Sequence, residues 1–346
     1  TACFTNVFGQ QENAAQAAAN THETKQKTIA KCQADFASDD PEIRRRAVLI
    51  LGKYELLPAL RTVIQALRDP NARVRQAALV SLLENTTGRT GRRLAAATIL
   101  AMLDDPDVHI RRLVSSSLRM VAVAYSVQHA GPGTAKRPDQ LPEAASRTDI
   151  ANAVKAAFSD DDTAVRKNMV ESFSFVSDFV SPSVLLPRFT DPVAAIRISA
   201  VRSASRRLPD SVFCEHAAPL VQDENPKVRR RLANILRTQE GEKAIFLLRE
   251  LANDEDPAVC GEAFASLILR KQPYNLQTLQ EKLTASRFET GTATRIIRRL
   301  SRLGSEGTAI CTALFNHDNP AYRAAAVAAL PRTAVEQVGR DRILAL

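Results

Sequence analysis

Reactive side chains are few in this chain, and only three of them stand together, in Cys214-Glu215-His216. Consecutive side chains on a helix point in different directions, so these three do not converge on a substrate. The other cysteines and histidines are scattered, and no two histidines are spaced to share one helix face. We therefore expect no catalytic site, no metal site and no bound cofactor, and we predict that the protein is not an enzyme.

Motifs of common enzyme classes are also absent. The chain contains no H-E-x-x-H, no G-x-S-x-G and no Walker-type phosphate loop. The stretch from Gly131 to Lys136 superficially resembles such a loop, but its spacing is wrong and no strand pattern precedes it.

The composition favours an all-α fold. Of the 346 residues 45% are hydrophobic, yet only 5% are aromatic, Trp is absent and Gly occurs 12 times. Sandwiches and barrels are richer in aromatic residues, whereas Ala, Leu, Val and Ile suit closely packed helices. No run of 18 apolar residues occurs, so we predict no membrane span.

The chain is basic, with a formal net charge of +9, and 36 of its 47 basic residues are Arg. Such a balance fits nucleic acid, an anionic membrane or an acidic protein as partner. An arginine repeated for structural reasons would produce the same excess.

Residues 1–24 are interpreted as a flexible N-terminal segment. Thr1-Ala2-Cys3 is similar to the end of a bacterial lipobox, which makes Cys3 a candidate site of lipid attachment. Val7-Phe8-Gly9 is similar to the end of a secretory signal. Both features slightly favour an exported cell-envelope location over a cytoplasmic one, although Cys3 also fits an ordinary cysteine near a frayed end.

A pattern of Asp, Asn or Pro followed by a β-branched residue and Arg recurs through the rest of the chain. Its arginines are Arg44, Arg75, Arg111, Arg166, Arg197, Arg229 and Arg323, and Cys260 takes the position in one copy. Most steps are near 31 residues, which is the period of a helical repeat array. The longer step after Arg111 indicates an inserted loop at about 125–147, rich in Pro and Gly.

Each copy predicts two helices. The acidic and Pro cluster begins a first helix, because Asp and Asn accept from free N–H groups and Pro suits the first turn. Second helices are predicted at 57–67, 93–103, 148–158, 243–251 and 276–283, and a lone second helix at 25–36. One copy has lost the motif, and its first helix is predicted at 292–302.

This pattern resembles HEAT repeats, particularly the short bacterial form found in phycobilisome lyases. The resemblance covers residues 25–346 and implies an α-solenoid, a right-handed superhelix of about nine helix pairs. It places first helices on the convex side and second helices along the concave side. It also implies a structural ladder of hydrogen bonds between units, formed by Asp69, Arg75, Asp105, Arg111, Asp160, Arg166, Asp191, Arg197, Asp223 and Arg229.

Surplus arginines remain beside the ladder, mostly on first helices, as in Arg45-Arg46 and Arg230-Arg231. Because the second helices expected in the concave groove are not basic, nucleic-acid binding is the less favoured alternative. A bilin-lyase activity is a further alternative, suggested by the resemblance alone. A DNA glycosylase is another enzyme alternative among HEAT-like proteins, but it is a poor match because the chain has no Trp to hold a damaged base.

The sequence thus predicts a scaffold for protein–protein interaction or assembly. Insertions in repeat arrays often carry recognition, so we expect the inserted loop to contact the partner. Its candidate contact residues are Tyr125, His129, Lys136 and Arg137.

Overall fold

A computed structural model of the protein describes residues 22–84, 88–129 and 141–330, and these residues form helices and no strand. The all-α prediction is confirmed. In the described part of the chain, no helix is long and apolar enough to cross a membrane.

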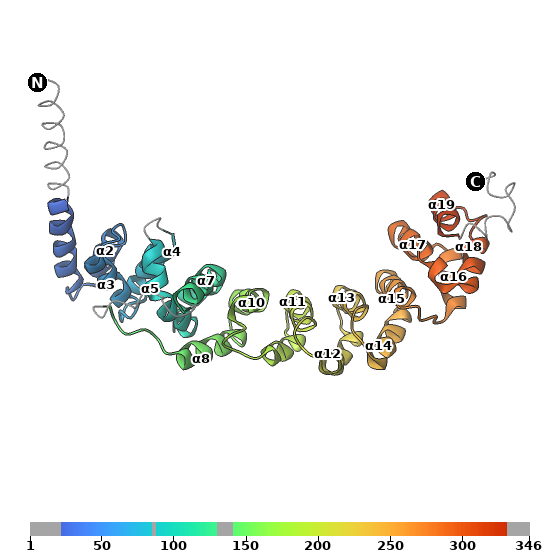
Figure 1. Cartoon of the computed structure of the whole chain (residues 1–346), viewed down its shortest axis with the longest axis horizontal. Coiled ribbons are helices and arrows are strands. Elements are labelled where there is room, and N and C mark those ends of the chain that lie inside the picture. The colour runs from blue at the N-terminus through green and yellow to red at the C-terminus, as the bar shows by residue number, and fades with distance from the viewer. Residues whose placement is uncertain (1–21, 85–87, 130–140, 331–346) are drawn as a thin grey trace, which may run out of the picture. The chain divides into compact units, whose positions relative to one another are not determined.

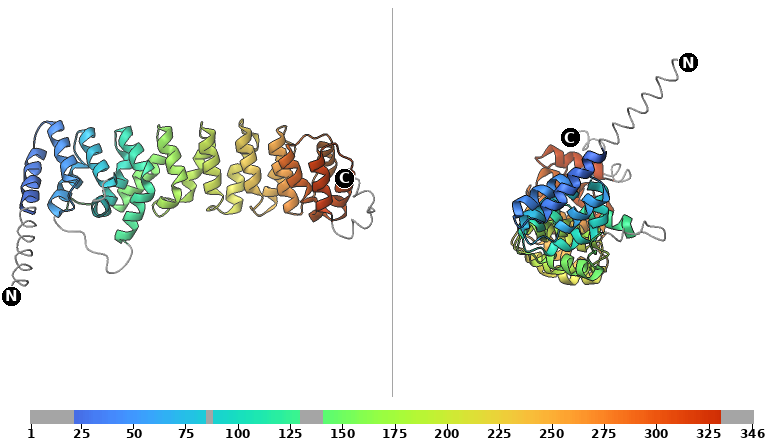
Figure 2. Two further views of the ribbon diagram at one scale, coloured as in Figure 1. Left: turned by 90° about the horizontal axis from the view of Figure 1, so that it is seen from above. Right: turned by 90° about the vertical axis from the view of Figure 1, so that its left-hand side faces the viewer.

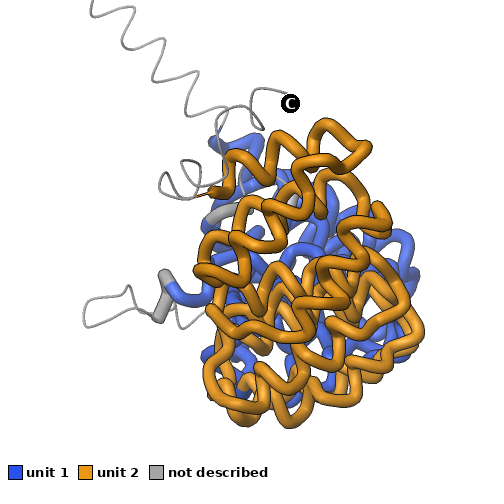
Figure 3. The backbone as a smooth tube through the Cα atoms, turned by 90° about the vertical axis from the view of Figure 1, so that its right-hand side faces the viewer, with its two compact units in different colours: residues 1–181 blue, residues 182–346 orange. Residues whose placement is uncertain are grey.

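The chain divides into two compact units, Thr1–Ser181 and Pro182–Leu346 (Figure 3). Within each unit the helices lie side by side across the direction in which the stack grows (Figure 2). Unit 1 contains a helix at 22–36, α2 (Pro41–Leu51), α3 (Leu57–Ala66), α4 (Ala72–Glu84), α5 (Gly88–Ala101), η1 (Met102–Asp104), α6 (Val108–Ser116), α7 (Leu118–His129), α8 (Arg147–Phe158), α9 (Thr163–Glu171) and α10 (Phe173–Val176).

Unit 2 continues the same alternation. It contains η2 (Pro182–Thr190), α11 (Ala194–Ala204), α12 (Asp210–Ala217), η3 (Ala218–Gln222), α13 (Pro226–Leu236), α14 (Glu242–Ala252), α15 (Pro257–Leu269), α16 (Leu276–Thr284), α17 (Thr290–Ile297), η4 (Leu300–Leu303), α18 (Ser305–Ala313) and α19 (Pro320–Ala329).

The helices at the position of the repeated motif are here called the motif helices, and all of them except α11 and α17 begin at a predicted Asp or Asn cap. Their members are α2, α4, α6, α9, α11, α13, α15, α17 and α19. Asp40 accepts from the backbone N–H of Glu42 at 2.8 Å, and Asn225 from that of Lys227 at 2.9 Å. These contacts satisfy N–H groups that have no partner inside the helix, and a proline follows each cap at the first helical position.

Unit 2 is a two-layer stack. Its motif helices α11, α13, α15, α17 and α19 form one layer, on the inner side of the curve that this unit follows in Figure 1. The other layer, α12, α14, α16 and α18, lies on the outer side. Successive motif helices pack extensively against each other, whereas successive helices of the other layer make sparse contacts. Closer approach along one layer is what curvature toward that layer requires.

This arrangement corrects one implication of the resemblance. We expected the helices that begin at the motif to lie on the convex side and the others to line the concave groove. In unit 2 the motif helices occupy the inner side. The helix count and positions do not depend on which layer lies inside, so the sequence pattern alone could not decide this point.

The inserted loop is also shorter than predicted. Residues 125–129 belong to α7, and Arg147 is the first residue of α8. The chain bends at Ser117 and continues as α7, which packs against α5 and buries Val121 and Ala122. The helix therefore continues past the predicted boundary at 125, and the Pro/Gly cluster follows it in the sequence.

The degenerate copy also differs from the prediction. Residues expected to form one helix at 292–302 form α17 and the short η4. Ile296, Ile297 and Leu300 are fully buried, so the apolar stripe of a motif helix persists although the motif itself is lost.

Candidate binding surface

The predicted ladder residues meet in pairs that join consecutive motif helices. The Arg75 guanidinium donates to both carboxylate oxygens of Asp105, at 2.8 and 2.7 Å. Its remaining nitrogen, Nη1, donates to the carbonyl oxygens of Asp69 and Pro70, at 3.0 and 3.1 Å. One side chain thus holds the start of its own helix and the start of the next one.

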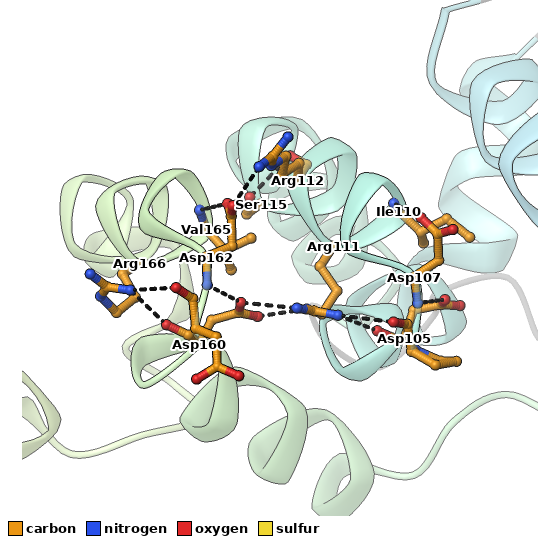
Figure 4. Close-up of polar contacts among 12 residues, drawn as sticks. Asp105, Asp107, Ile110, Arg111, Arg112, Ser115, Asp160, Asp162, Val165 and Arg166 are labelled. Atoms are coloured by element: carbon orange, nitrogen blue, oxygen red, sulfur yellow. Dashed lines mark hydrogen bonds and ion pairs between the residues drawn. The ribbon is translucent and has the colours of Figure 1, made fainter. Parts of the chain in front are cut away.

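The same arrangement repeats along both units. The two-pronged pairs are Arg44–Asp69, Arg75–Asp105, Arg111–Asp160, Arg197–Asp223 and Arg229–Asp254. Figure 4 shows Arg111 reaching Asp160 while Arg166 donates to the backbone carbonyl of Asp160. Bidentate Arg–carboxylate pairs are strong and directional, which fixes the register of neighbouring helices.

The electrostatics of the ladder follow from these contacts. The hydrogen bond to Asp105 raises the pKa of Arg75, although burial acts against it. Burial would raise the pKa of Asp69, but the hydrogen bonds from Arg44 and from the backbone of Asn71 lower it overall. The guanidinium of Arg75 and the carboxylate of Asp69 are therefore both held in their charged forms.

Two predicted ladder residues lie on opposite sides of the unit boundary. Arg166 belongs to unit 1, where it donates to the carbonyl oxygens of Asp160 and Asp161 at 2.8 and 3.0 Å. Asp191 belongs to unit 2, where it accepts from the backbone N–H of Val193 at 3.0 Å.

Among the described residues of unit 2, the two-pronged pairs stop at Asp254, because the next motif position is Cys260. The Cys260 thiol is buried and donates to the carbonyl oxygen of Ala252 at 3.0 Å. The ammonium of Lys282 lies 3.1 Å from its sulfur. Burial raises the pKa of Cys260, while Lys282 acts in the opposite direction. An arginine at this position would meet a lysine instead of an aspartate.

Part of the arginine surplus in unit 1 is paired locally. Arg45 and Arg46 both contact Glu42, and these bonds lower the pKa of Glu42 to about 2. Arg112 pairs with Asp162 at 2.6 Å and lowers its pKa to about 2. Such exposed pairs contribute little to stability.

Unit 2 separates its charges between its two layers. The α-helices of the motif layer carry eight basic residues and one acidic residue, a net of +7. Those of the outer layer carry three Lys or Arg and six acidic residues, a net of −3. The expectation that the surplus lies on the outer, convex side is therefore wrong for unit 2.

The one acidic residue of that layer, Glu262 on α15, sits in a group we call the Glu262 cluster. It consists of Asn234, Glu262 and Arg295. Glu262 is only 5% exposed, and its carboxylate accepts from Asn234 and from Arg295, both at 2.8 Å. Sequence analysis missed this group because its members lie about 30 residues apart and meet only through the stacking of α13, α15 and α17.

Of the four predicted contact residues of the loop, the structure describes the side chain of Tyr125 alone. Tyr125 lies on α7, where its ring meets that of Phe179 edge-on at 5.2 Å. His129 ends α7, while Lys136 and Arg137 lie outside the described residues, as do Cys3 and residues 1–21. Beside α7 a pocket of about 690 Å³ is lined by Arg93, Arg119, Met120 and Val123, among others.

The reactive trio does not form a site. Cys214 is buried, whereas Glu215 and His216 are exposed. Burial raises the pKa of Cys214, with a smaller contribution from Asp210 in the same direction. Over the residues that the structure describes, no three His, Cys, Asp or Glu side chains are placed to hold a metal ion.

The sequence pattern described as HEAT repeats matches this chain at residues 32–119 and 215–298. The chain is a HEAT-repeat protein. Both matched ranges begin inside the helix before a motif helix and end at or just beyond a later one.

Solved structures include other proteins with a similar course of the chain. One is an engineered protein, 14% identical, with a TM-score of 0.41 over 87% of this chain and 98% of that one. Another is YibA of Escherichia coli, 16% identical, with a TM-score of 0.48 over 77% of this chain and 90% of that one. No curated protein matches the HEAT-repeat chain in sequence.

Proposed function

We propose that this protein is a non-enzymatic scaffold that uses the motif helices of unit 2 to bind an acidic segment of a protein partner. The observation that carries the proposal is the separation of charge: leaving out the paired ladder arginines Arg197 and Arg229, the net is +5 on the motif layer against −3 on the outer layer. A surface with one sign of charge attracts a ligand of the other sign and orients its approach.

The kind of residue favours protein over nucleic acid. Seven of the eight basic residues in the motif layer are Arg, which is enriched at protein interfaces where Lys is depleted. Guanidinium groups also match carboxylates in a two-pronged geometry. The large exposed aromatic of unit 2, Phe246, lies on α14 of the outer layer, so it offers no stacking platform on the basic face.

The proposal is tested by reversing one charge on each layer. Arg231 on α13 and Lys243 on α14 are both exposed, and replacing either by Glu changes the net charge by the same amount. We expect Arg231→Glu to weaken binding of a poly-glutamate peptide about tenfold, and Lys243→Glu to leave it within about twofold. Equal losses in the two variants, measured by fluorescence anisotropy, would contradict a specific basic face.

Nucleic acid is the second candidate for the partner. The sequence disfavoured it because the helices expected in the concave groove were not basic, whereas in unit 2 the basic motif helices lie on the inner side of the curve. Contacts to phosphates alone would give affinity for duplex DNA that falls steeply with salt. Tighter binding of duplex DNA than of poly-glutamate at about 0.15 M salt would replace the protein partner with nucleic acid.

The non-enzymatic part of the proposal has its own tests. Its two enzyme alternatives are a bilin lyase and a DNA glycosylase. A change in visible absorbance on adding a tetrapyrrole, or release of bases from alkylated DNA, would each overturn it.

A further inference from the structure

Exposed apolar side chains on α7 line the pocket of unit 1. Met120 and Val123 are 38% and 51% exposed, and they stand three residues apart, so they share one face of the helix. Ala124 continues that face. Val121 and Ala122 are buried, on the side of α7 that packs against α5. Helix α7 is therefore apolar on two sides, of which one is covered and the other is exposed.

The pocket beside this exposed face is large enough to receive side chains of a partner. Its volume is about 690 Å³, within the range of cavities that hold ligands. Thr90 and Arg93 of α5, Ser116 of α6 and Arg119 of α7 belong to its polar lining. Single exposed apolar residues are ordinary on a protein surface, whereas neighbours that share a face and line a cavity indicate a binding site.

The charges of the pocket are of one sign. Its described lining carries three guanidinium groups and no carboxylate. The guanidinium of Arg92 donates through Nη1 to the carbonyl oxygens of Leu82 and Leu83, at 3.3 and 3.0 Å, and so holds the start of α5 to the end of α4. Arg93 and Arg119 are exposed and have no ion pair with a described residue. The pocket therefore favours apolar ligands that also carry negative charge.

We infer that this pocket receives the apolar side chains of an acidic, amphipathic segment of a protein partner. A helix with an apolar residue every three or four positions would place those residues on Met120 and Val123. Acidic residues of the segment would face Arg93 and Arg119. Because exposed charge pairs contribute little energy, burial of the apolar side chains supplies most of the affinity, and the charges select the segment.

The kinds of lining residue support a protein as the partner. The basic residues of the lining are all Arg, and Met contributes to its apolar part. Arg and Met are enriched in protein interfaces, whereas Lys is depleted. The inference goes beyond the proposed function, because it gives unit 1 a docking site of its own that does not depend on the basic motif layer of unit 2.

The absence of tryptophan from the chain allows a local reporter. Thr90 is exposed and lines the pocket, so the single indole of Thr90→Trp responds to docking there. The probe is a peptide of about 14 residues with leucine every three or four positions, glutamate between them and no tryptophan. We expect the peptide to shift the emission of Thr90→Trp to shorter wavelength. Ile50→Trp, at an exposed position of α2 that does not line the pocket, is expected to show no shift.

Titrations of the Thr90→Trp protein then test the pocket itself. Adding Val123→Glu places a charge where leucine docks and repels the glutamates, so we expect affinity to fall about tenfold. Adding Ile50→Glu makes the same kind of change at another exposed apolar residue and is expected to alter affinity less than about twofold. A peptide with lysine in place of glutamate is expected to bind about tenfold more weakly than the glutamate peptide.

Four results would overturn the inference. They are unchanged emission of Thr90→Trp at high peptide concentration, equal losses in the Val123→Glu and Ile50→Glu proteins, equal binding of the lysine peptide, and a shift caused by decanoate but not by the peptide, which would indicate a lipid pocket. The proposed function is judged separately. Binding of poly-glutamate to Arg231→Glu reports on unit 2 and does not depend on the emission of Thr90→Trp.

Discussion

At the scale of single residues, the ladder arginine has two tasks that no other side chain can combine. Arg75 binds the carboxylate of Asp105 with two nitrogens and the carbonyls of Asp69 and Pro70 with the third. Lysine offers a point charge without this fork. The repeated arginine is therefore a structural requirement of the helix stack, and only the arginines outside the ladder are available to a partner.

Replacing Arg75 by Ala tests this role. The pair with Asp105 is buried, and removing one partner leaves the other charge without compensation, so we expect a loss of about 3 kcal/mol in the free energy of unfolding. Exposed Arg73, replaced in the same way, is expected to cost less than about 0.5 kcal/mol. Urea unfolding measures both, and similar losses would show that the pair is not structural.

The exposed pair of Arg112 and Asp162 predicts a pH dependence. Its hydrogen bond lowers the pKa of Asp162 from 3.8 to about 2 in the folded protein. A carboxyl group with a lowered folded pKa stabilises the protein above its unfolded pKa and loses that contribution as the pH falls through the folded one. The melting temperature of Arg112→Gln is therefore expected to lie slightly below that of the wild type at pH 6 and to equal it near pH 2. A difference that grows toward low pH would contradict this assignment.

At the scale of helices, a glycine allows the backbone of α18 to approach that of η4 closely. A Cβ on Gly307 of α18 would overlap the carbonyl oxygen of Leu300, whereas a Cβ on Gly291 of α17 would meet no atom within 4 Å. The backbone at the turn before α18 can take this course only beside a residue without a side chain.

Alanine at these two positions is expected to have opposite effects. Gly307→Ala must displace backbone and is expected to cost about 2 kcal/mol or more. Gly291→Ala is expected to gain up to about 1 kcal/mol, since Ala favours the helix and nothing obstructs it. Thermal unfolding of both variants decides the matter, and a stable Gly307→Ala protein would mean that η4 and α18 can move apart.

Much of the order and many of the starts of the helices were predictable from the sequence. Asp40 and Asn225 mark helix starts because each places a short hydrogen-bond acceptor directly before a proline, where it can accept from the free backbone N–H groups of the first turn. The longer step after Arg111 located the insertion but not its ends. The end of α7 at residue 129 could not be placed, because no Pro or Gly interrupts the chain before the Pro/Gly cluster. A periodic pattern does not show whether a motif helix forms a repeat with the helix before it or with the helix after it, so this pairing could not be predicted.

The binding surface was less accessible to sequence reasoning. Asn234, Glu262 and Arg295 occupy nearby positions on three successive motif helices, and only their stacking brings the amide and guanidinium to one carboxylate. The surplus arginines were visible in the chain, but the side of the stack on which they lie was not. That side follows from closer packing along the motif layer, which is a tertiary property.

At the scale of the whole molecule, the net charge of +9 has a measurable cost. Charges of one sign on the motif layer repel, while the ladder pairs are buried and respond little to salt. We therefore expect the melting temperature at neutral pH to rise by a few degrees between about 0.02 and 0.2 M sodium chloride. A fall over this range, in a thermal scan, would show that attractive surface pairs outweigh the repulsion.

The pair of Arg111 and Asp160 has a practical consequence. It joins residues 49 positions apart, although the equivalent pairs span 25 to 30, so the extra chain leaves the link between motif helices unchanged. The starts of α6 and α9 are thereby held together independently of how much sequence runs between α7 and α8. Epitope tags or whole domains grafted between these two helices are thus expected to leave the fold intact, which offers a route to labelled or immobilised protein for the binding experiments.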